Sequence, residues 1–285
     1  MHRESGDFLA YANATKKDGQ LQVYVYIERN QSFRIAMLVR TEGIVLRSVP
    51  YKETSRLATL YTRTLGKLTL IAHGAQSIKS RFGATLQLLS HVQAVIYTRP
   101  TRSIQILSDC SHVRVYNEIT SDLTKVAIGQ RICELVLSLT EEGQNSPEIF
   151  DLLVRVMNAL DSPDVDAVLL KLYFQIQLME LLGFAPAFSR ESVEEIAESG
   201  GYLLLENGTI TSQAIDDLST LFASRSVLRA FAILHRADFD IILRLKLTAA
   251  QRKELHTLVT TFMRYHVPDT YPVRGQKVID QLLGS

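Results

Sequence analysis

The sequence predicts an α+β fold, in which an N-terminal β-barrel of the OB-fold type precedes a mainly helical domain with a small β-hairpin insertion. Short runs rich in Val, Ile, Thr and Tyr, separated by turn residues, fill residues 41–116 and are typical of strands. After Ser121 the apolar residues recur at helical spacing instead. The charge balance changes in the same region, from eleven Lys and Arg against three Asp and Glu in residues 37–117 to 15 against 23 in residues 118–285. We therefore expect a barrel domain over 37–117 and a helical domain over 118–285.

The first 36 residues mix polar segments with one alternating stretch, 21–27, and a more regular pattern begins at Met37. We interpret residues 1–36 as an extension, or as the product of an upstream start codon. The alternative is an additional edge strand over 22–28. No role is assigned to this part of the chain.

Five short strands are expected in the barrel domain, over residues 43–47, 57–62, 67–72, 88–97 and 104–107. Leu65-Gly66 can close a hairpin between the second and third runs, and residues 99–102 can close another between the fourth and fifth. Five antiparallel strands within some 70 residues fit a small barrel, of which the OB-fold is a common form.

Helix ends can be recognised in the second domain. Ser146 followed by Pro147 begins a helix with a one-sided apolar stripe, because proline suits the first helical position. A second helix over about 164–182 is apolar nearly all round and ends at Gly183, so it should be the buried central helix.

Two further local signals follow that central helix. Residues 203–205 and 209–211 flank Asn207-Gly208, which predicts a hairpin with a two-residue loop over 202–211. Thr248 and Gln251 form a capping box ahead of another helix.

The motifs of common enzyme classes are missing. Gly66-Lys67 lacks the upstream glycine of a phosphate-binding loop and is followed by Leu68 rather than Ser or Thr. Cys110 and Cys133 lie far apart in sequence, and no histidines pair at helical spacing, so we predict neither a metal knuckle nor a nucleophile with its base. We expect a protein that is not an enzyme. A cytoplasmic location is expected, since no membrane span or secretory signal is seen.

The positive signal is a mixture of cations and aromatic residues in the barrel domain. Cations can follow the phosphates of a single strand while aromatic rings stack on its bases. The competing interpretation, that the aromatic residues are barrel core, is favoured for each ring taken alone. The residues chosen as DNA contacts are Lys52, Arg56, Lys67, Lys79, Arg81, Arg99 and Arg102.

An ordered set of short motifs runs from Met37 nearly to the C-terminus. Its members are Gly43-Ile44-Val45-Leu46-Arg47, Tyr51-Lys52-Glu53-Thr54-Ser55, Gly66-Lys67-Leu68, Gly74-Ala75, Lys79-Ser80-Arg81-Phe82-Gly83, Pro147-Glu148-Ile149-Phe150-Asp151-Leu152-Leu153 and Leu181-Leu182-Gly183-Phe184-Ala185-Pro186. This set resembles that of the bacterial recombination mediator family RecO, although the region after Phe188 matches poorly.

The resemblance implies an OB-fold followed by a helical domain, no enzymatic turnover, and a role in DNA repair through binding and annealing of single strands. It also implies three partners: RecR, the single-stranded-DNA-binding protein and, indirectly, RecA. Lys79 and Arg81 fall in the loop that is basic in the family, whereas His73 and Gln76 stand where further cations are common. Many members carry a four-cysteine zinc site, but residues 188–211 contain no cysteine, so no zinc or other cofactor is expected.

The acidic and apolar tail of the single-stranded-DNA-binding protein would need an apolar groove beside a cation. We consider Ile149, Phe150, Leu153, Arg131 and Arg155 for this contact, with plain helix core as the competing interpretation of the apolar positions. Two other functions stay open, a scaffold whose barrel docks an acidic protein and an OB-fold that binds RNA.

Overall fold

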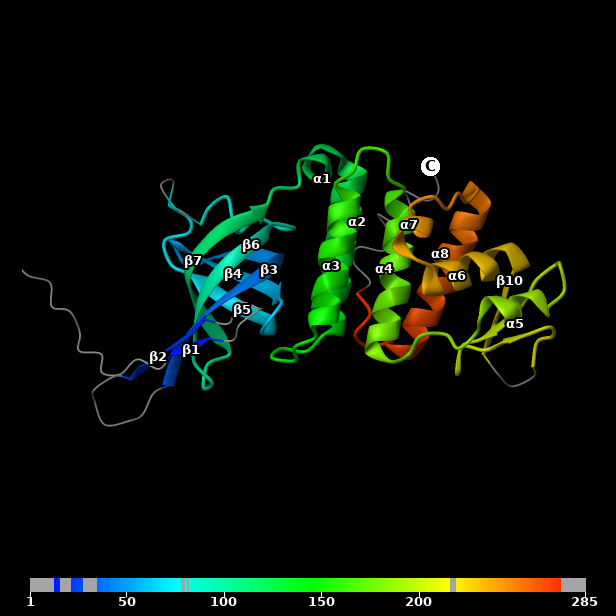
Figure 1. Cartoon of the computed structure of the whole chain (residues 1–285), viewed down its shortest axis with the longest axis horizontal. Coiled ribbons are helices and arrows are strands. Elements are labelled where there is room, and N and C mark those ends of the chain that lie inside the picture. The colour runs from blue at the N-terminus through cyan, green and yellow to red at the C-terminus, as the bar shows by residue number, and fades with distance from the viewer. Residues whose placement is uncertain are drawn as a thin grey trace, which may run out of the picture. The chain divides into compact units, whose positions relative to one another are not determined.

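A computed structural model describes residues 13–15, 22–27, 35–77, 80, 82–215 and 219–272, with side chains from Met37 onward. The chain forms two compact units, which we call the barrel unit and the helical unit (Figure 1). The barrel unit comprises Met1–Tyr116 and Thr140–Val154, and the helical unit comprises Asn117–Leu139 and Arg155–Ser285. Residues 140–154 therefore group with the barrel although they follow the first helices in the sequence.

Five strands close the barrel, and this confirms the predicted fold class. They are β3 (Ile35–Tyr51), β4 (Ser55–Thr62), β5 (Gly66–Ala72), β6 (His91–Thr98) and β7 (Ile104–Arg114). The long strand β3 pairs with β4 through its second half and with β6 through its first half, and the parallel pair β5–β7 closes the circle. Because β3 pairs with both β4 and β6, and β5 pairs with β7, the five strands form a closed barrel.

Two short strands precede the barrel, β1 (Asn13–Thr15) and β2 (Gln22–Ile27). β2 lies antiparallel to the beginning of β3, with Val23 opposite Val39 and Ile27 opposite Ile35. The structure thus has the additional strand that was the alternative interpretation of residues 22–28.

The barrel core consists of inward-facing residues of all five strands and of three residues from the loop between β5 and β6. Val45, Leu60, Leu70, Val92 and Ile96 are completely buried. The loop contributes Ala75, Phe82 and Leu86 to the same cluster. Since a fully buried Val, Leu, Ile or Phe stabilises a fold by about 1.5–3 kcal/mol, these three side chains fix the ends of the loop on the barrel.

Residues 140–154 continue the barrel unit along the turn between β4 and β5. The amide of Gly143 donates to the carbonyl of Lys67 over 3.1 Å, and the Tyr61 hydroxyl donates to the carbonyl of Ser146 over 3.3 Å. Gly66 has a φ of +65°, and a Cβ there would lie 2.1 Å from the carbonyl oxygen of Gln144. Only glycine permits so close an approach with this backbone conformation.

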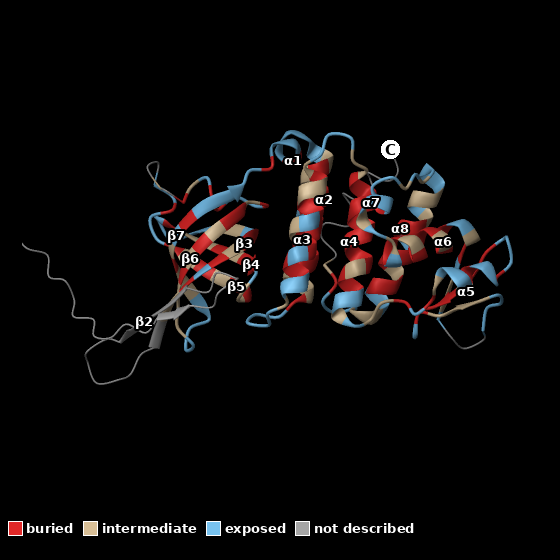
Figure 2. Cartoon of the chain, viewed as in Figure 1, coloured by how far each residue is buried: buried red, intermediate tan, exposed pale blue. Residues whose placement is uncertain are grey.

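The helical unit is built around α4 (Ala167–Leu182), which is buried over most of its length (Figure 2). Asp166 caps its start, because its side chain accepts from the amide of Leu169, and Gly183 ends it with a φ of 83°. The predicted central helix and its stop are confirmed. The other helices are α1 (Asn117–Ser121), α2 (Leu123–Leu139), α3 (Pro147–Leu160), α5 (Arg190–Glu194), α6 (Arg225–Arg236), α7 (Phe239–Ile242) and α8 (Ala249–His266).

α4 packs against α2, α6 and α8, and the capping box of Thr248 and Gln251 at the start of α8 is present as predicted. α3 begins at Pro147, also as predicted. Among the described residues, every helix is too short or too polar to cross a lipid bilayer.

A small sheet in the order β10-β8-β9 completes the helical unit, with β8 (Gly201–Leu204), β9 (Ile210–Thr211) and β10 (Thr220–Ala223). β8 and β9 form the predicted hairpin, but its loop has four residues, since the last backbone pair is Leu204 with Thr209. The two-residue loop was wrong for a physical reason. A type I′ turn needs positive φ at both central residues, and Gly208 has a φ of +71° whereas Asn207 is not in that region.

Candidate nucleic-acid interface

A β-bulge in β3 directs Arg47 to the outside of the barrel. Val45 pairs with Leu60 and points into the core, but the next pair along the strand is Arg47 with Thr59, so Leu46 is the additional residue. Without the bulge, strict alternation would put Arg47 on the same face as Val45, inside the barrel. Arg47 is instead exposed, and no ion pair engages it among the described residues.

Four residues further along β3, on the same face, the strand reaches Tyr51, which is 37% exposed. Lys52 follows in the turn with a φ of 51°, and its ammonium lies 5.5 Å from the centre of the Tyr51 ring. Because a positive φ is uncommon for a residue with a Cβ, the neighbouring structure must hold this turn.

Gln76 supplies that support from the loop after β5. Its amide group donates to the carbonyls of Lys52, over 3.0 Å, and of Ser55, over 2.5 Å. The backbone amide of Gln76 also donates to the carbonyl of Thr54 over 2.9 Å. The family often has a cation where this chain has Gln76. Here the Gln76 side chain has a structural role, because it joins the loop after β5 to the turn that carries Lys52.

Arg56 lies at the start of β4, half-buried, and its Nε donates to the Ser48 hydroxyl over 3.1 Å. This bond orients the guanidinium beside the β3–β4 turn. Arg56 pairs with Pro50, so it lies on the same face of the strand pair as Ser48, opposite to the face of Arg47 and Tyr51. We call Arg47, Tyr51 and Lys52 the β3 face. Glu53 is the one acidic residue of the turn, so the charge of the β3 face is positive.

Lys79 and Arg81, the two residues chosen from the family resemblance, lie outside the described residues. The loop on either side of them is attached to the barrel, because Ala75 and Phe82 are buried in the barrel core. Within the loop, the amide of Ser80 donates to the carbonyl of Ser77 over 2.8 Å. Their contact with DNA stays a prediction.

Lys67 and the neighbouring Arg63 contact residues 140–154. The Lys67 ammonium donates to the carbonyl of Thr140, and burial lowers its pKa below the usual value, against the opposing effect of Glu142. Arg63 lies 2.7 Å from the Asp151 carboxylate and 4.7 Å from the centre of the Phe150 ring. Both cations hold the barrel unit together, and this engagement counts against Lys67 as a DNA contact.

Arg99 and Arg102 belong to the turn between β6 and β7, which Gln105 fixes by accepting from the Arg99 amide over 2.7 Å and donating to the Arg102 carbonyl over 2.6 Å. Thr98 pairs with Met37 at the beginning of β3, whereas Lys52 follows the end of that strand. The five predicted contacts that the structure describes thus fall in three places of the barrel, and Lys52 alone of them belongs to the β3 face.

The aromatic residues separate into core and surface. Tyr61 and Phe82 are buried, and burial raises the pKa of the Tyr61 hydroxyl. Tyr97 is half-buried, which leaves Tyr51 as the most exposed ring of those counted in the sequence pattern. For Tyr61 and Phe82, the interpretation as barrel core holds.

The residues considered for a partner tail are mostly interior. Phe150 and Leu153 are completely buried and Ile149 is 3% exposed. Arg131 is 2% exposed, donates to the Pro272 carbonyl over 2.5 Å and lies 4.9 Å from the Tyr271 ring. These contacts favour a structural role. Arg155 is exposed and lies 5.9 Å from the Phe239 ring.

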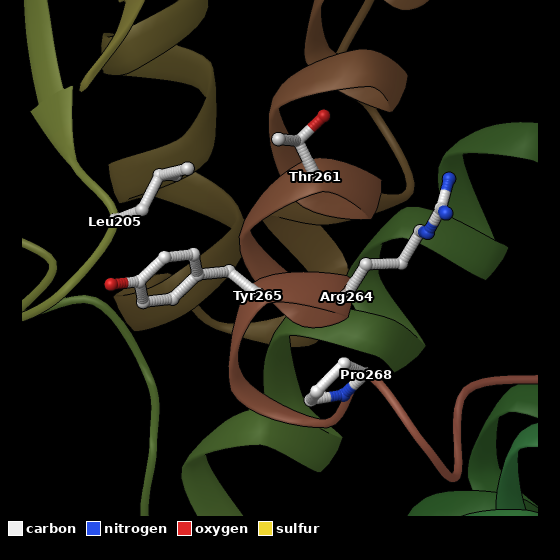
Figure 3. A pocket seen from close by; sticks show the side chains of 5 residues that line it. All are labelled: Leu205, Thr261, Arg264, Tyr265 and Pro268. Atoms are coloured by element: carbon white, nitrogen blue, oxygen red, sulfur yellow. The ribbon is translucent and has the colours of Figure 1, made fainter. Parts of the chain in front are cut away.

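A surface hollow of about 290 Å³ lies at the end of α8 and is lined by Leu205, Thr261, Arg264, Tyr265 and Pro268. Figure 3 shows the Tyr265 ring beside Leu205, whereas Arg264 leaves α8 in another direction. The hollow is suited to an apolar side chain more than to a charged group.

The described residues bear on two kinds of catalytic group, metal clusters and reactive thiols. No group of three or more His, Cys, Asp and Glu side chains in them is arranged to hold a metal ion. Both cysteines are buried and free, and burial raises the pKa of Cys110 to about 11 and that of Cys133 further. A thiol with a raised pKa is a poor nucleophile at neutral pH.

The sequence pattern placed Arg47 in the basic block but did not select it as a candidate contact. The signal that would place it outside is the bulge at Leu46, which alternation alone does not reveal. A small closed barrel with cations and an exposed ring on one strand is typical of proteins that bind single-stranded nucleic acid.

Comparison with known proteins identifies the family. The sequence model of the family described as Recombination protein O N terminal matches residues 37–116, and that described as Recombination protein O C terminal matches residues 120–274. The chain is 41% identical over 248 residues to the DNA repair protein RecO of Salinibacter ruber (strain DSM 13855 / M31), which covers 87% of this chain and 95% of that protein.

Two further relatives carry the same name. The protein of Chloroherpeton thalassium is 25% identical over 258 residues, covering 87% of this chain and 100% of that protein. The protein of Alkaliphilus metalliredigens is 27% identical over 235 residues, covering 81% of this chain and 94% of that protein. The chain belongs to the RecO family.

Proposed function

We propose that this protein acts in DNA repair as a recombination mediator that binds single-stranded DNA and anneals complementary strands without performing chemistry on them. The observation that carries the proposal is the β3 face. There, Arg47 and Lys52 are exposed, and the Lys52 ammonium lies 5.5 Å from the centre of the exposed Tyr51 ring. Phosphates can meet the cations while a base stacks on the ring.

Annealing follows physically from such a surface. Two complementary strands repel each other through their phosphates, and a basic surface that neutralises part of this charge lowers the repulsion. Binding also raises the local concentration of each strand near the other. Neither effect needs a nucleotide cofactor or a metal ion, in line with the prediction that this member of the family carries no zinc.

The family supports the partners of this activity, which are RecR, the single-stranded-DNA-binding protein and, through them, RecA in the cytoplasm. The C-terminal tail of the single-stranded-DNA-binding protein needs exposed apolar surface, and Phe150 and Leu153 do not offer it because they are buried. The hollow beside Tyr265 does. Changing Tyr265 to Ala should weaken binding of a synthetic tail peptide, and unchanged peptide affinity would exclude the hollow.

The central experiment reverses two charges of the β3 face in the full-length chain, as Arg47→Glu with Lys52→Glu. Hydrogen bonds to charged groups contribute about 1.5–3 kcal/mol each, so affinity for a labelled oligonucleotide should fall at least tenfold, which corresponds to about 1.4 kcal/mol. The slope of log K against log salt should become shallower by about 1.4, since each lost phosphate contact of a single strand removes about 0.7.

The matched control is Arg190→Glu with Arg264→Glu, which changes the net charge equally at two exposed arginines of the helical unit. It should leave binding and annealing within about twofold, because neither arginine belongs to the barrel unit that carries the proposed contacts. An equal loss in both double variants would show that only net charge matters. The pair Lys79→Glu with Arg81→Glu tests the loop after β5 in the same assay.

The competing functions are distinguished by the same measurements. A scaffold for an acidic protein predicts no micromolar binding of single-stranded DNA at 0.15 M salt. An RNA binder predicts tighter binding of the ribose strand of identical sequence, because the 2′-OH is the group that differs.

A further inference from the structure

The cations of the acidic half of the chain are unevenly distributed. Residues 118–285 contain 15 Lys and Arg against 23 Asp and Glu. Residues 225–253 hold seven of those cations and only two of the acids, Asp238 and Asp240. This stretch covers α6, α7 and the beginning of α8, so a basic region lies within a part of the chain whose total charge is negative.

Three of the seven cations have carboxylate partners. Arg225 and Arg229 both pair with Glu194, at 3.0 Å and 2.8 Å, and these contacts fasten α6 to the end of α5. Arg252 pairs with Asp166, the N-cap of α4, at 2.8 Å. Structural ion pairs therefore account for the two ends of the stretch.

Of the other four cations, three lie between these ion pairs in the sequence and Lys253 follows Arg252. Arg236 is the last residue of α6, Arg244 and Lys246 follow α7, and Lys253 lies in the first turns of α8. All four are exposed, and none forms an ion pair with another described residue. We call residues 236–253 the α6–α8 segment.

A fifth cation joins the α6–α8 segment from α3. The guanidinium of Arg155 lies 5.9 Å from the Phe239 ring, and Phe239 itself packs on Tyr173 of the central helix at 5.1 Å between ring centres. Arg155 is exposed, so Phe239 holds it beside α7 with its charge in solvent. Against Asp238 and Asp240, the five cations without ion pairs leave a local excess of three positive charges.

We propose that the α6–α8 segment is a second single-strand-binding surface, which holds the phosphates of another DNA strand while the β3 face holds the first. The inference rests on the proposed function, because it assumes that the barrel binds a strand. It adds the reason why a basic region is placed in the acidic half. A protein that anneals two strands needs two phosphate tracks, and elsewhere the helical unit would repel a polyanion.

Nucleic acid suits this surface better than an acidic peptide does. Its cations without ion pairs occur at several points along 18 residues of chain, from the end of one helix to the beginning of another, and a nucleic-acid strand likewise carries its charge at many points. The exposed apolar side chains there, Ile241 at 53% and Leu243 at 46%, are two single residues rather than the lining of the hollow described at the end of α8.

The test uses the full-length chain with Arg244→Glu and Lys246→Glu together. The control of equal charge change is Arg190→Glu with Ser212→Glu and Gln213→Glu, at exposed residues outside both the α6–α8 segment and the hollow at the end of α8. Two short oligonucleotides of non-complementary sequence, one labelled with a donor and one with an acceptor dye, report simultaneous binding by energy transfer. Anisotropy of a single oligonucleotide reports the first strand, and annealing of complementary strands is timed separately. A polyglutamate-rich peptide serves as the acidic-peptide probe.

The wild-type protein and the control should give energy transfer and anneal. The Arg244/Lys246 variant should keep its affinity for one strand within about threefold but lose the energy transfer and anneal at least about tenfold more slowly. Unchanged energy transfer or unchanged annealing in this variant would overturn the proposal. It would also be overturned if the variant lost binding of the acidic peptide but still bound the second DNA strand. Failure of the wild-type protein to bind even one strand would instead refute the proposed function itself.

Discussion

The sharpest test of the β3 face removes its aromatic ring without changing any charge. Tyr51 is 37% exposed, and among the described residues its ring is contacted by the Lys52 ammonium at 5.5 Å. Stacking of a base on an aromatic side chain contributes about 1–3 kcal/mol. Changing Tyr51 to Ala should therefore weaken oligonucleotide binding by roughly 5- to 150-fold, at 1.4 kcal/mol for each factor of ten.

The assay is fluorescence anisotropy at several salt concentrations, with urea unfolding of the same preparations. The slope of log K against log salt should stay at the wild-type value, because no phosphate contact is lost. Stability should change by no more than about 0.5 kcal/mol, since the substitution is at the surface. Tyr51→Phe should bind normally, as stacking needs only the ring.

The control is Tyr61→Phe, which removes the hydroxyl that donates to the Ser146 carbonyl inside the barrel unit. It should cost about 0.5–1.5 kcal/mol of stability and leave DNA affinity unchanged. The reasoning is refuted if Tyr51→Ala binds within twofold of the wild-type protein, or if its salt slope falls as though a charge were lost.

Four further predictions concern pH, the hairpin, the thiols and zinc. Burial lowers the pKa of His91, so below about pH 6.5 the imidazole is protonated more readily in the unfolded chain than in the folded one. The free energy of unfolding should therefore fall from pH 7.5 to 5.5 by more in the wild-type protein than in His91→Gln. Equal shifts of the urea midpoint in the two proteins would contradict this. Gly208→Ala should lower the free energy of unfolding by about 1–3 kcal/mol, because φ is +71° and the new Cβ would lie 2.5 Å from the Pro186 Cα. If the variant unfolded at the same denaturant concentration as the wild-type protein, the hairpin would have to adapt to the side chain. Both cysteines should resist a thiol reagent in the native protein and react in guanidinium, since burial raises their pKa values; fast labelling of the native protein would argue against this packing. Elemental analysis of the purified protein should find no stoichiometric zinc, and a full equivalent would disprove the sequence-based expectation.

Features set by neighbouring residues were predictable from the sequence. Gly183 ends α4, and the Thr248–Gln251 box begins α8, because caps depend on a few adjacent backbone groups. The strands of the barrel followed from composition and turns. The outward direction of Arg47 did not, since the bulge at Leu46 is a property of the pairing between β3 and β4.

Contacts between distant parts of the chain account for the other differences. β10 was not expected as a third strand beside β8, and Lys67 could not be known to reach the carbonyl of Thr140 from 73 residues away. The same limit affected the candidate sites. A cation in a basic block looks alike whether it faces solvent, as Lys52 does, or fastens a loop, as Lys67 does.

Residues 140–154 belong to the barrel unit, so the barrel cannot be isolated by cutting the chain after its last strand. A fragment that stops at Tyr116 carries all five barrel strands but none of the chain that covers the β4–β5 turn. Tyr61 would lose its acceptor at Ser146, Lys67 its acceptor at Thr140, and Arg63 its carboxylate at Asp151. Replacing the barrel of one family member by that of another should therefore succeed only when residues 140–154 are exchanged together with the strands. The barrel unit is thus encoded by two separate stretches of sequence.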